Sequence, residues 1–192
     1  MANTQIYQLK ITLKHIKPPI WRKVQVKSNI TLNELHLILN AAMGWTCSHL
    51  HDFTIDDKNY AVPDPEFDIY KKIIDDKKIK LNKVLIFEKT KFTYTYDFGD
   101  DWEHEIILEK ILPIEENVKY PICLKGKRNC PPEDCGSIPG YENLCKAMKD
   151  PTNPEHEEIL EWVGGEYDPE YFDLEDINDA IKDPVDNMED FL

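Results

Sequence analysis

The sequence lacks the features that would place it in a membrane or mark it for export. None of its apolar runs approaches the roughly 18 residues that a helix needs to cross a bilayer. The opening residues, MANTQIYQLK, do not contain the apolar stretch of a signal peptide. We therefore expect a soluble cytoplasmic protein with no membrane partner.

The sequence also lacks the short motifs of several enzyme classes. It contains no nucleophile elbow, no phosphate-binding loop and no zinc-protease helix motif. Its cysteines number five, an odd count that argues for reduced thiols rather than a disulfide framework. Because nothing in the sequence specifies a reaction, a non-enzymatic module that binds a protein partner is the leading interpretation.

Acidic residues are absent from the beginning of the chain, and basic residues are nearly absent from its end. Residues 1–91 carry 15 Lys and Arg against 10 Asp and Glu, a net charge of +5. Residues 92–192 carry 8 against 27, a net charge of −19. Non-specific nucleic-acid binding requires many cationic contacts, so a chain with a net charge of −14 is a poor candidate for it.

The first 30 residues are the one place where a nucleic acid could bind. They contain six basic and no acidic residues, namely Lys10, Lys14, Lys17, Arg22, Lys23 and Lys27. The alternative is intramolecular, because a positive strand pair that faces the acidic half of the chain would lower self-repulsion without any partner.

The 192 residues, 41% of them hydrophobic, suit one compact domain with additions. We divide the chain into a single domain over 1–182 and an acidic tail over 183–192. Within the domain we expect a sheet-rich part over 1–122, an irregular Cys- and Pro-rich loop over 123–140, and a helical part over 141–182.

Periodic patterns predict the strands and helices. Thr31 and Glu34 form a capping box for a helix that Gly44 closes, and Asp173 caps the last helix. Apolar alternation and turn residues predict the remaining elements: strands at 6–14, 21–27, 49–55, 60–62 and 118–121, a short helix containing Phe67, Tyr70, Ile73 and Ile74, and helices at 141–149, 153–162 and 174–181.

The densest run of specific residue types is FTYTYDFGDDWEHEIILE, from Phe92 to Glu109. Aromatic residues alternate with polar ones up to residue 98, and Gly99-Asp100-Asp101 is typical of a tight turn. On the return strand one face is apolar and the other carries glutamates. The pattern predicts a half-buried β-hairpin with acidic residues at its tip.

Candidate metal ligands gather at this hairpin. Asp97, Asp100, Asp101 and His104 place carboxylates and an imidazole close together in the sequence, as a cation site requires. With metal-bound water as nucleophile, these residues would form the centre of a metal-dependent hydrolase or nuclease-like enzyme. The structural alternative is that the aspartates are turn residues and that His104 is a hydrogen-bonded core histidine.

Two further sets of residues could bind zinc. His49 and His51 would lie about 7 Å apart on one face of a strand. Cys123, Cys130 and Cys135, with His104 or His51, could complete a tetrahedral zinc site that staples the irregular loop. The alternatives are structural histidines at the end of the sheet and small buried thiols that behave as apolar groups.

Three segments resemble the plasmid pRiA4b ORF-3-like family: YDFGDDWEH (Tyr96–His104), PPEDCGSIPGY (Pro131–Tyr141) and FDLEDIN (Phe172–Asn178). The resemblance extends from about residue 6 to residue 181. It implies an α+β roll with a mixed or antiparallel sheet, one helix packed on it and a C-terminal acidic helical segment. Members of the family often carry Gly-Gly after the loop cysteine, whereas Ser137 follows Gly136 here, which weakens the expectation of a positive φ at residue 137.

The resemblance implies little about activity. Relatives occur as plasmid-borne and transposon-associated proteins, and some carry the label of transposition accessory proteins. A nucleic-acid-associated accessory role therefore joins the interaction module and the metal-dependent hydrolase as an alternative.

Overall fold

The computed structural model describes residues 4–64 and 72–184. Its centre is one open, eight-stranded sheet with the order β5-β4-β3-β6-β7-β1-β2-β8. The strands are β1 (Ile6–Leu13), β2 (Trp21–Lys27), β3 (His51–Ile55), β4 (Lys58–Ala61), β5 (Ile73–Asp75), β6 (Lys91–Tyr96), β7 (Trp102–Leu112) and β8 (Ile122–Lys127). Neighbouring strands are antiparallel except β4 and β5, which are parallel. The predicted α+β class with a mixed sheet is confirmed.

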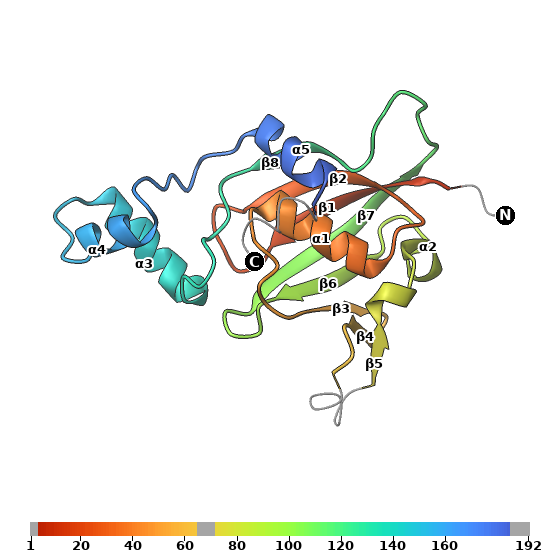
Figure 1. Cartoon of the computed structure of the whole chain (residues 1–192), viewed down its shortest axis with the longest axis horizontal. Helices are drawn as coiled ribbons and strands as arrows, with labels where there is room; N and C mark the ends of the chain where they lie inside the picture. Colours follow the sequence, from red (N-terminus) through yellow and green to blue (C-terminus); the bar gives the residue numbers. More distant parts are fainter. Residues whose placement is uncertain (1–3, 65–71, 185–192) are drawn as a thin grey trace.

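The described residues contain five α-helices, some of which cover one face of the sheet (Figure 1). They are α1 (Leu32–Met43), α2 (Leu81–Val84), α3 (Ser137–Lys149), α4 (His156–Trp162) and α5 (Leu174–Lys182), with a single 3-10 turn at Asp76–Lys78. The long helix α1 lies across the sheet and buries its apolar side on the inward-facing residues of the strands. No described helix is long and apolar enough to span a bilayer.

The predicted caps of α1 are confirmed. The Thr31 hydroxyl accepts a hydrogen bond from the Glu34 N–H, and the Glu34 carboxylate accepts one from the Thr31 N–H. Gly44 ends the helix with a φ of 90°, a left-handed conformation that favours glycine. The helix end is thereby fixed immediately before Trp45, from which the chain enters the candidate site.

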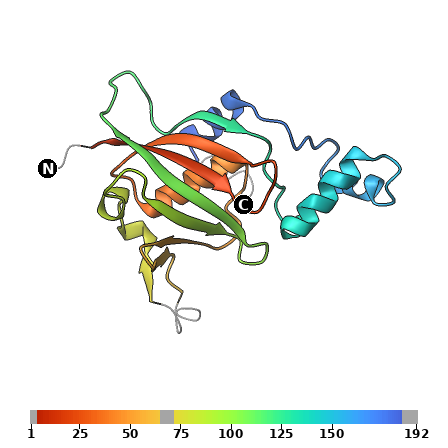
Figure 2. The same ribbon diagram turned by 180° about the vertical axis from the view of Figure 1, so that it is seen from behind.

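The other face of the sheet is open (Figure 2) and carries paired charges. Lys14 lies 2.9 Å from the Glu103 carboxylate, Lys23 lies 2.8 Å from Glu109, and Lys91 lies 3.0 Å from Glu105. Because β1 is hydrogen-bonded to both β2 and β7, the basic strands lie beside the acidic face of β7.

Other side chains of the basic N-terminal stretch also have partners within the chain. Arg22 is buried and donates to the Ala42 carbonyl, and Lys10 lies over the Trp21 ring. Together with Lys14 and Lys23, four of the six basic residues are engaged within the chain.

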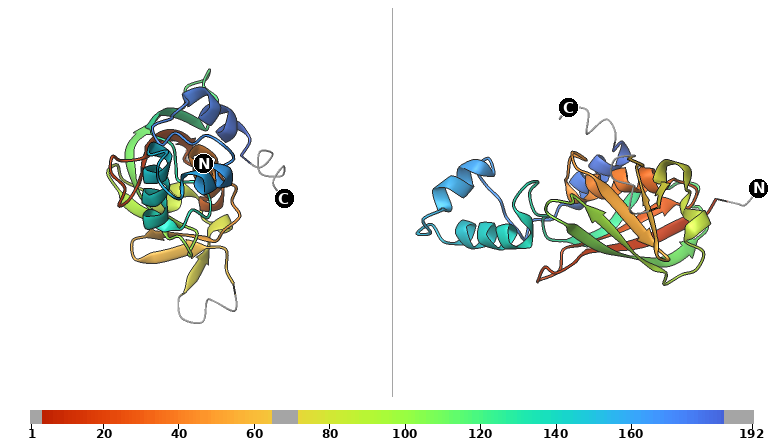
Figure 3. Two further views of the ribbon diagram at one scale, coloured as in Figure 1. Left: turned by 90° about the vertical axis from the view of Figure 1, so that its left-hand side faces the viewer. Right: turned by 90° about the horizontal axis from the view of Figure 1, so that it is seen from below.

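The helices α3 and α4 project from one end of the sheet (Figure 3). They pack on each other, and the chain then returns to α5, which packs on α1 and β8. Asp173 caps α5 as predicted, since its carboxylate accepts hydrogen bonds from the backbone N–H groups of Glu175 and Asp176. The projecting pair is an excursion between β8 and α5, and we call it the helical lobe.

Two predictions are wrong: the irregular loop over 123–140 and the strand at 118–121. Residues 122–127 form β8 and α3 begins at Ser137, so regular structure enters both ends of the predicted loop over 123–140, while the strand predicted at 118–121 is absent. Gly126 is close to Phe172, whose Cε2 atom would lie 2.2 Å from an added Cβ, and Pro139 occupies the first turn of α3, where its missing N–H costs no bond. Gly126 therefore allows close packing within a strand, and Pro139 lies in the first turn of a helix, so neither residue marks an irregular loop.

Two further predictions need correction. Ile73 and Ile74 belong to β5 rather than to a helix, while Phe67 and Tyr70 lie outside the described residues.

Ser137 has a φ of 62°, so the left-handed turn forms without the second glycine. The Ser137 hydroxyl donates to the Asp100 carbonyl at 2.7 Å, a contact that offsets the backbone strain.

Candidate functional site

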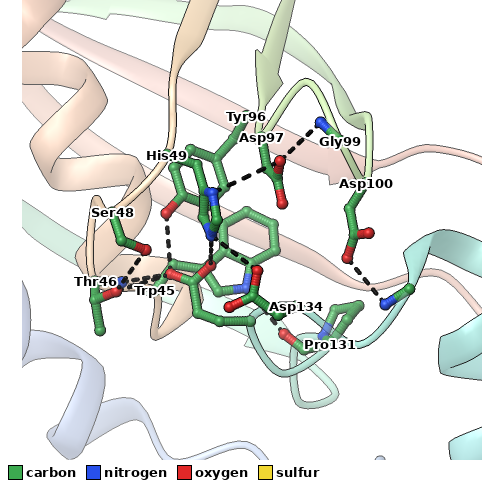
Figure 4. A network of polar contacts seen from close by, with 12 residues as sticks. Trp45, Thr46, Ser48, His49, Tyr96, Asp97, Gly99, Asp100, Pro131 and Asp134 are labelled. Carbon is green, nitrogen blue, oxygen red and sulfur yellow. Dashed lines mark hydrogen bonds and ion pairs between the residues drawn. The ribbon is translucent and has the colours of Figure 1, made fainter.

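Three segments meet at the end of the sheet near the helical lobe (Figure 4). One is the connection from α1 to β3, residues 44–50; the second is the tip of the β6–β7 hairpin, residues 97–101; the third is the segment 130–137. We call their meeting point the hairpin site. It unites two of the three sequence segments that carry the family resemblance.

Asp97 is turned inward at the hairpin tip. Its φ of 58° is left-handed, which an aspartate tolerates. Its N–H donates to the Leu50 carbonyl at 2.8 Å, and its Oδ1 accepts from the Gly99 N–H at 2.8 Å. The side chain is 9% exposed. The hairpin thus fixes a nearly buried carboxylate beside the α1–β3 connection.

His49 lies among three carboxylates. Its Nδ1 is 3.7 Å from Asp97 Oδ1, and its Nε2 is 3.2 Å from Asp134 Oδ1 and 3.7 Å from Glu133 Oε2. The imidazole is 27% exposed. One ligand atom each from His49, Asp97 and Asp134 falls within 4.8 Å of the others, and this is the only such group of three or more in residues 4–64 and 72–184.

Glu133 fastens the segments to one another. Its Oε1 accepts hydrogen bonds from the Thr46 N–H at 2.8 Å and from the Tyr96 hydroxyl at 3.0 Å. Its Oε2 has no hydrogen-bond partner although it is shielded from solvent, and the same holds for His49 Nε2. One carboxylate oxygen is therefore structural, while the other faces the histidine unsatisfied.

Aromatic rings form the floor of the site. Trp45 stacks on Tyr96 with a centroid separation of 5.0 Å, and its indole N–H donates to the Pro131 carbonyl at 2.9 Å. Burial raises the pKa of the Tyr96 phenol, and the Glu133 carboxylate adds to the rise. Burial likewise raises the pKa of the Cys47 thiol to about 12, again with a contribution from Glu133. Neither group is ionised near neutral pH, so neither acts as an anionic nucleophile there.

The structure brings only one of the four predicted hairpin ligands into this cluster. Asp100 accepts from the Gly136 N–H through Oδ2 at 3.1 Å and so ties the hairpin to the segment 130–137. Asp101 is exposed. His104 is fully buried behind the strand, where its Nδ1 lies 3.3 Å from the Tyr94 carbonyl. The predicted cluster of Asp97, Asp100, Asp101 and His104 is therefore absent.

His51 also belongs to the core rather than to the hairpin site. The strand begins at His51, so His49 lies outside it and the two side chains do not share a strand face. His51 Nε2 lies 2.8 Å from the buried Asp76 Oδ2, and its ring stacks on His36 at 3.5 Å. The structural alternative is confirmed for His51 and His104.

The cysteines do not converge either. Cys123 and Cys130 are buried, and Cys130 Sγ contacts Met43 Sδ and the Arg22 guanidinium. Burial raises the pKa of the Cys135 thiol to about 12. Within the described ranges, neither these thiols nor His104 join a group with metal-ligand spacing. The predicted zinc staple of Cys123, Cys130 and Cys135 therefore lacks its geometry.

The site residues that the sequence did not suggest are Glu133 and Asp134. They follow Pro131 and Pro132 in the PPEDC segment, where two consecutive prolines stiffen the backbone. That segment and the hairpin both carry the family resemblance. This shared feature is the sequence signal that could have placed Glu133 and Asp134 in one site with the hairpin.

A cleft opens beside Asp134 between α3 and α4. Its volume is about 560 Å³. Leu144 and Ile159 supply apolar surface, and Trp162, which is 51% exposed, lies at the same opening. The carboxylates that line it are Asp134, Glu155, Glu158 and Glu161, and no lysine or arginine is among its lining residues. We call this feature the lobe cleft.

Comparison with known proteins places the chain in a family. The family model described as "Plasmid pRiA4b ORF-3-like protein" matches residues 5–176, which include the hairpin, the PPEDC segment and the helical lobe. The chain belongs to the plasmid pRiA4b ORF-3-like family. The resemblance found in three short segments is thus confirmed over most of the length.

Two similar proteins show how far the similarity extends. "Uncharacterized protein y4hQ" of Sinorhizobium fredii is 39% identical over 180 residues, which are 93% of this chain and 91% of that protein. The crystal structure of "Protein of Unknown Function MM3350" from Methanosarcina mazei Go1 has a TM-score of 0.80 and 39% sequence identity. The similarity covers 91% of this chain and 97% of that one.

Proposed function

We propose that this pRiA4b ORF-3-like protein is a non-enzymatic interaction module whose lobe cleft binds a basic segment of a partner protein. The observation that carries the proposal is the lining of the cleft, in which carboxylates surround an apolar floor and an exposed tryptophan. A cation lying over an indole ring gains favourable energy, and carboxylates attract the same cation.

The position and the lining of the cleft suit a peptide ligand. It lies between α3 and α4 in the helical lobe, which projects from one end of the sheet (Figure 3). Leu144 and Ile159 offer a place for one apolar side chain, while Glu158 and Glu161 flank it with negative charge. The expected ligand is a short segment with lysine or arginine on both sides of an apolar residue.

Charge decides against a nucleic acid as the occupant. The chain from Asp150 onward contains 16 acidic residues and one lysine, Lys182. A phosphate backbone would be repelled by the four carboxylates that line the cleft, whereas a basic peptide would be attracted to them over a distance that falls with salt. The same repulsion argues against a transposition-accessory role in which the helical lobe contacts DNA directly.

The test is a charge reversal in the cleft. Glu158→Lys combined with Glu161→Lys should weaken the binding of a synthetic Lys- and Arg-rich peptide with a central leucine by at least about tenfold at low salt, because attraction becomes repulsion. Isothermal titration calorimetry measures the affinity. The indole at position 162 gives a second readout, since Trp162→Phe should remove the fluorescence change that accompanies binding.

The matched control places the same charges elsewhere. Glu115→Lys combined with Glu116→Lys lies in the exposed β7–β8 connection and changes the net charge equally. The proposal is wrong if both double variants weaken binding to the same extent, because the effect would then reflect total charge rather than the cleft.

A further inference from the structure

We infer that the hairpin site binds one divalent transition-metal ion, such as Zn²⁺, through a ring nitrogen of His49 and carboxylate oxygens of Asp97 and Asp134. The three ligand atoms lie within 4.8 Å of one another. Ligands of one tetrahedral cation at bond lengths of about 2.1 Å are separated by about 3.4 Å. The shortest observed separation, 3.2 Å between His49 Nε2 and Asp134 Oδ1, is within about 0.2 Å of this value.

The site has an excess of negative charge that the protein does not compensate. Asp97, Glu133 and Asp134 surround His49, and within the described ranges none of these carboxylates forms an ion pair with a lysine or arginine. Asp97 is nearly buried, its ion-pair contact is with His49 Nδ1 at 3.7 Å, and a buried carboxylate is costly unless a nearby cation compensates it. A divalent cation would supply the missing positive charge.

Two unsatisfied atoms point to a ligand independently of the acidic residues. His49 Nε2 and Glu133 Oε2 are shielded from solvent, lack hydrogen-bond partners and lie 3.7 Å apart. Asp134 Oδ1 lies 3.2 Å from the same nitrogen without forming a hydrogen bond to it. Buried polar atoms in native proteins are nearly always hydrogen-bonded, so a nitrogen and an oxygen that lack such bonds and face each other indicate a bridging species. A metal ion at His49 would satisfy the nitrogen and attract the Glu133 oxygen.

The donor set selects the class of metal. One imidazole with carboxylates suits zinc, manganese or iron(II), whereas magnesium and calcium prefer oxygen ligands alone. The ligands come from three separate segments, so the cation would hold the hairpin tip and the PPEDC segment to the α1–β3 connection. Asp134 also lines the lobe cleft, although the metal site does not depend on a peptide binding there.

Calorimetric titration of chelator-treated full-length protein with ZnCl₂ tests the inference. The wild type should bind one Zn²⁺ per chain and show a higher Tm with the metal. His49→Gln and Asp134→Asn should each weaken binding at least about tenfold. Asp134 is 70% exposed, so its variant should fold even if the His49 variant does not.

Matched controls and a spectrum make the test decisive. His15→Gln and Asp57→Asn replace an exposed histidine and an exposed aspartate outside the site and should leave zinc affinity unchanged. The Co²⁺-loaded protein should show no thiolate charge-transfer band, because no cysteine is a ligand. Absence of saturable zinc binding, wild-type affinity in both site variants, or a thiolate band would each overturn the inference.

Discussion

Replacement of Asp76 by alanine is expected to lower the free energy of unfolding by about 3 kcal/mol or more. Asp76 has no exposed surface, and its Oδ2 lies 2.8 Å from His51 Nε2. Removing one partner of a buried ion pair or charge-assisted hydrogen bond leaves the other without its partner, a loss that typically costs 3 to 5 kcal/mol. The stacked His36 ring cannot replace the carboxylate as an acceptor for His51 Nε2.

Urea unfolding and thermal melting measure this loss. For a protein of this size, about 3 kcal/mol corresponds to a Tm lower by roughly 6 to 12 °C. Asp76→Asn keeps a polar group of the same shape and should lose less. The exposed Asp57→Asn is the matched control and should remain within about 0.5 kcal/mol of the wild type. A loss below about 1 kcal/mol in the alanine variant would mean that the buried pair does not stabilise the fold.

His104 should make the protein sensitive to acid. Burial lowers the pKa of His104 to about 4 in the folded protein, against an ordinary value of 6.5. Because the folded-state pKa is the lower one, the unfolded chain takes up the proton first as the pH falls. The stability is therefore complete above pH 6.5 and is lost progressively toward pH 4, with a total of about 3 kcal/mol.

His104→Leu isolates this contribution. The side chain is fully buried and its Nε2 has no hydrogen-bond partner, so leucine should be tolerated at neutral pH. Between pH 7 and pH 4 the variant should lose about 3 kcal/mol less than the wild type, as measured by urea unfolding across the pH range. His15→Gln, at an exposed position, should keep the wild-type slope. Equal slopes in His104→Leu and the wild type would contradict the predicted protonation.

The hairpin shows how far residue types can predict a site. The alternation between Phe92 and Glu109 predicted β6, β7 and the inward face that carries Trp102 and His104, and the structure confirms all of these. The prediction failed at the tip, because the direction of a turn side chain depends on φ at single residues. Only Asp97 joins the cluster with His49 and Asp134, while Asp100 accepts a hydrogen bond from the Gly136 N–H.

The predicted cysteine ligands do not converge in the structure, for a related reason. Their spacing along the chain was compatible with a metal site, but residues 122–127 pair with β2 and carry Cys123 into the sheet. Cys130 instead fills space between Met43 and Arg22. Spacing alone does not reveal which strand a segment will join, since strand pairing is a long-range interaction.

The sequence by itself determined the local elements of this protein: the capped helix α1, the strands β1 and β2, the hairpin, the cap of α5 and the family. Each of these elements depends on side chains within a few residues of one another, and the family is recognisable from three short segments. Only the tertiary structure decided that His49 meets Asp134, 85 positions later in the chain, and that His51 and His104 are buried in the core. Such contacts arise from burial and strand order, which are properties of the whole chain.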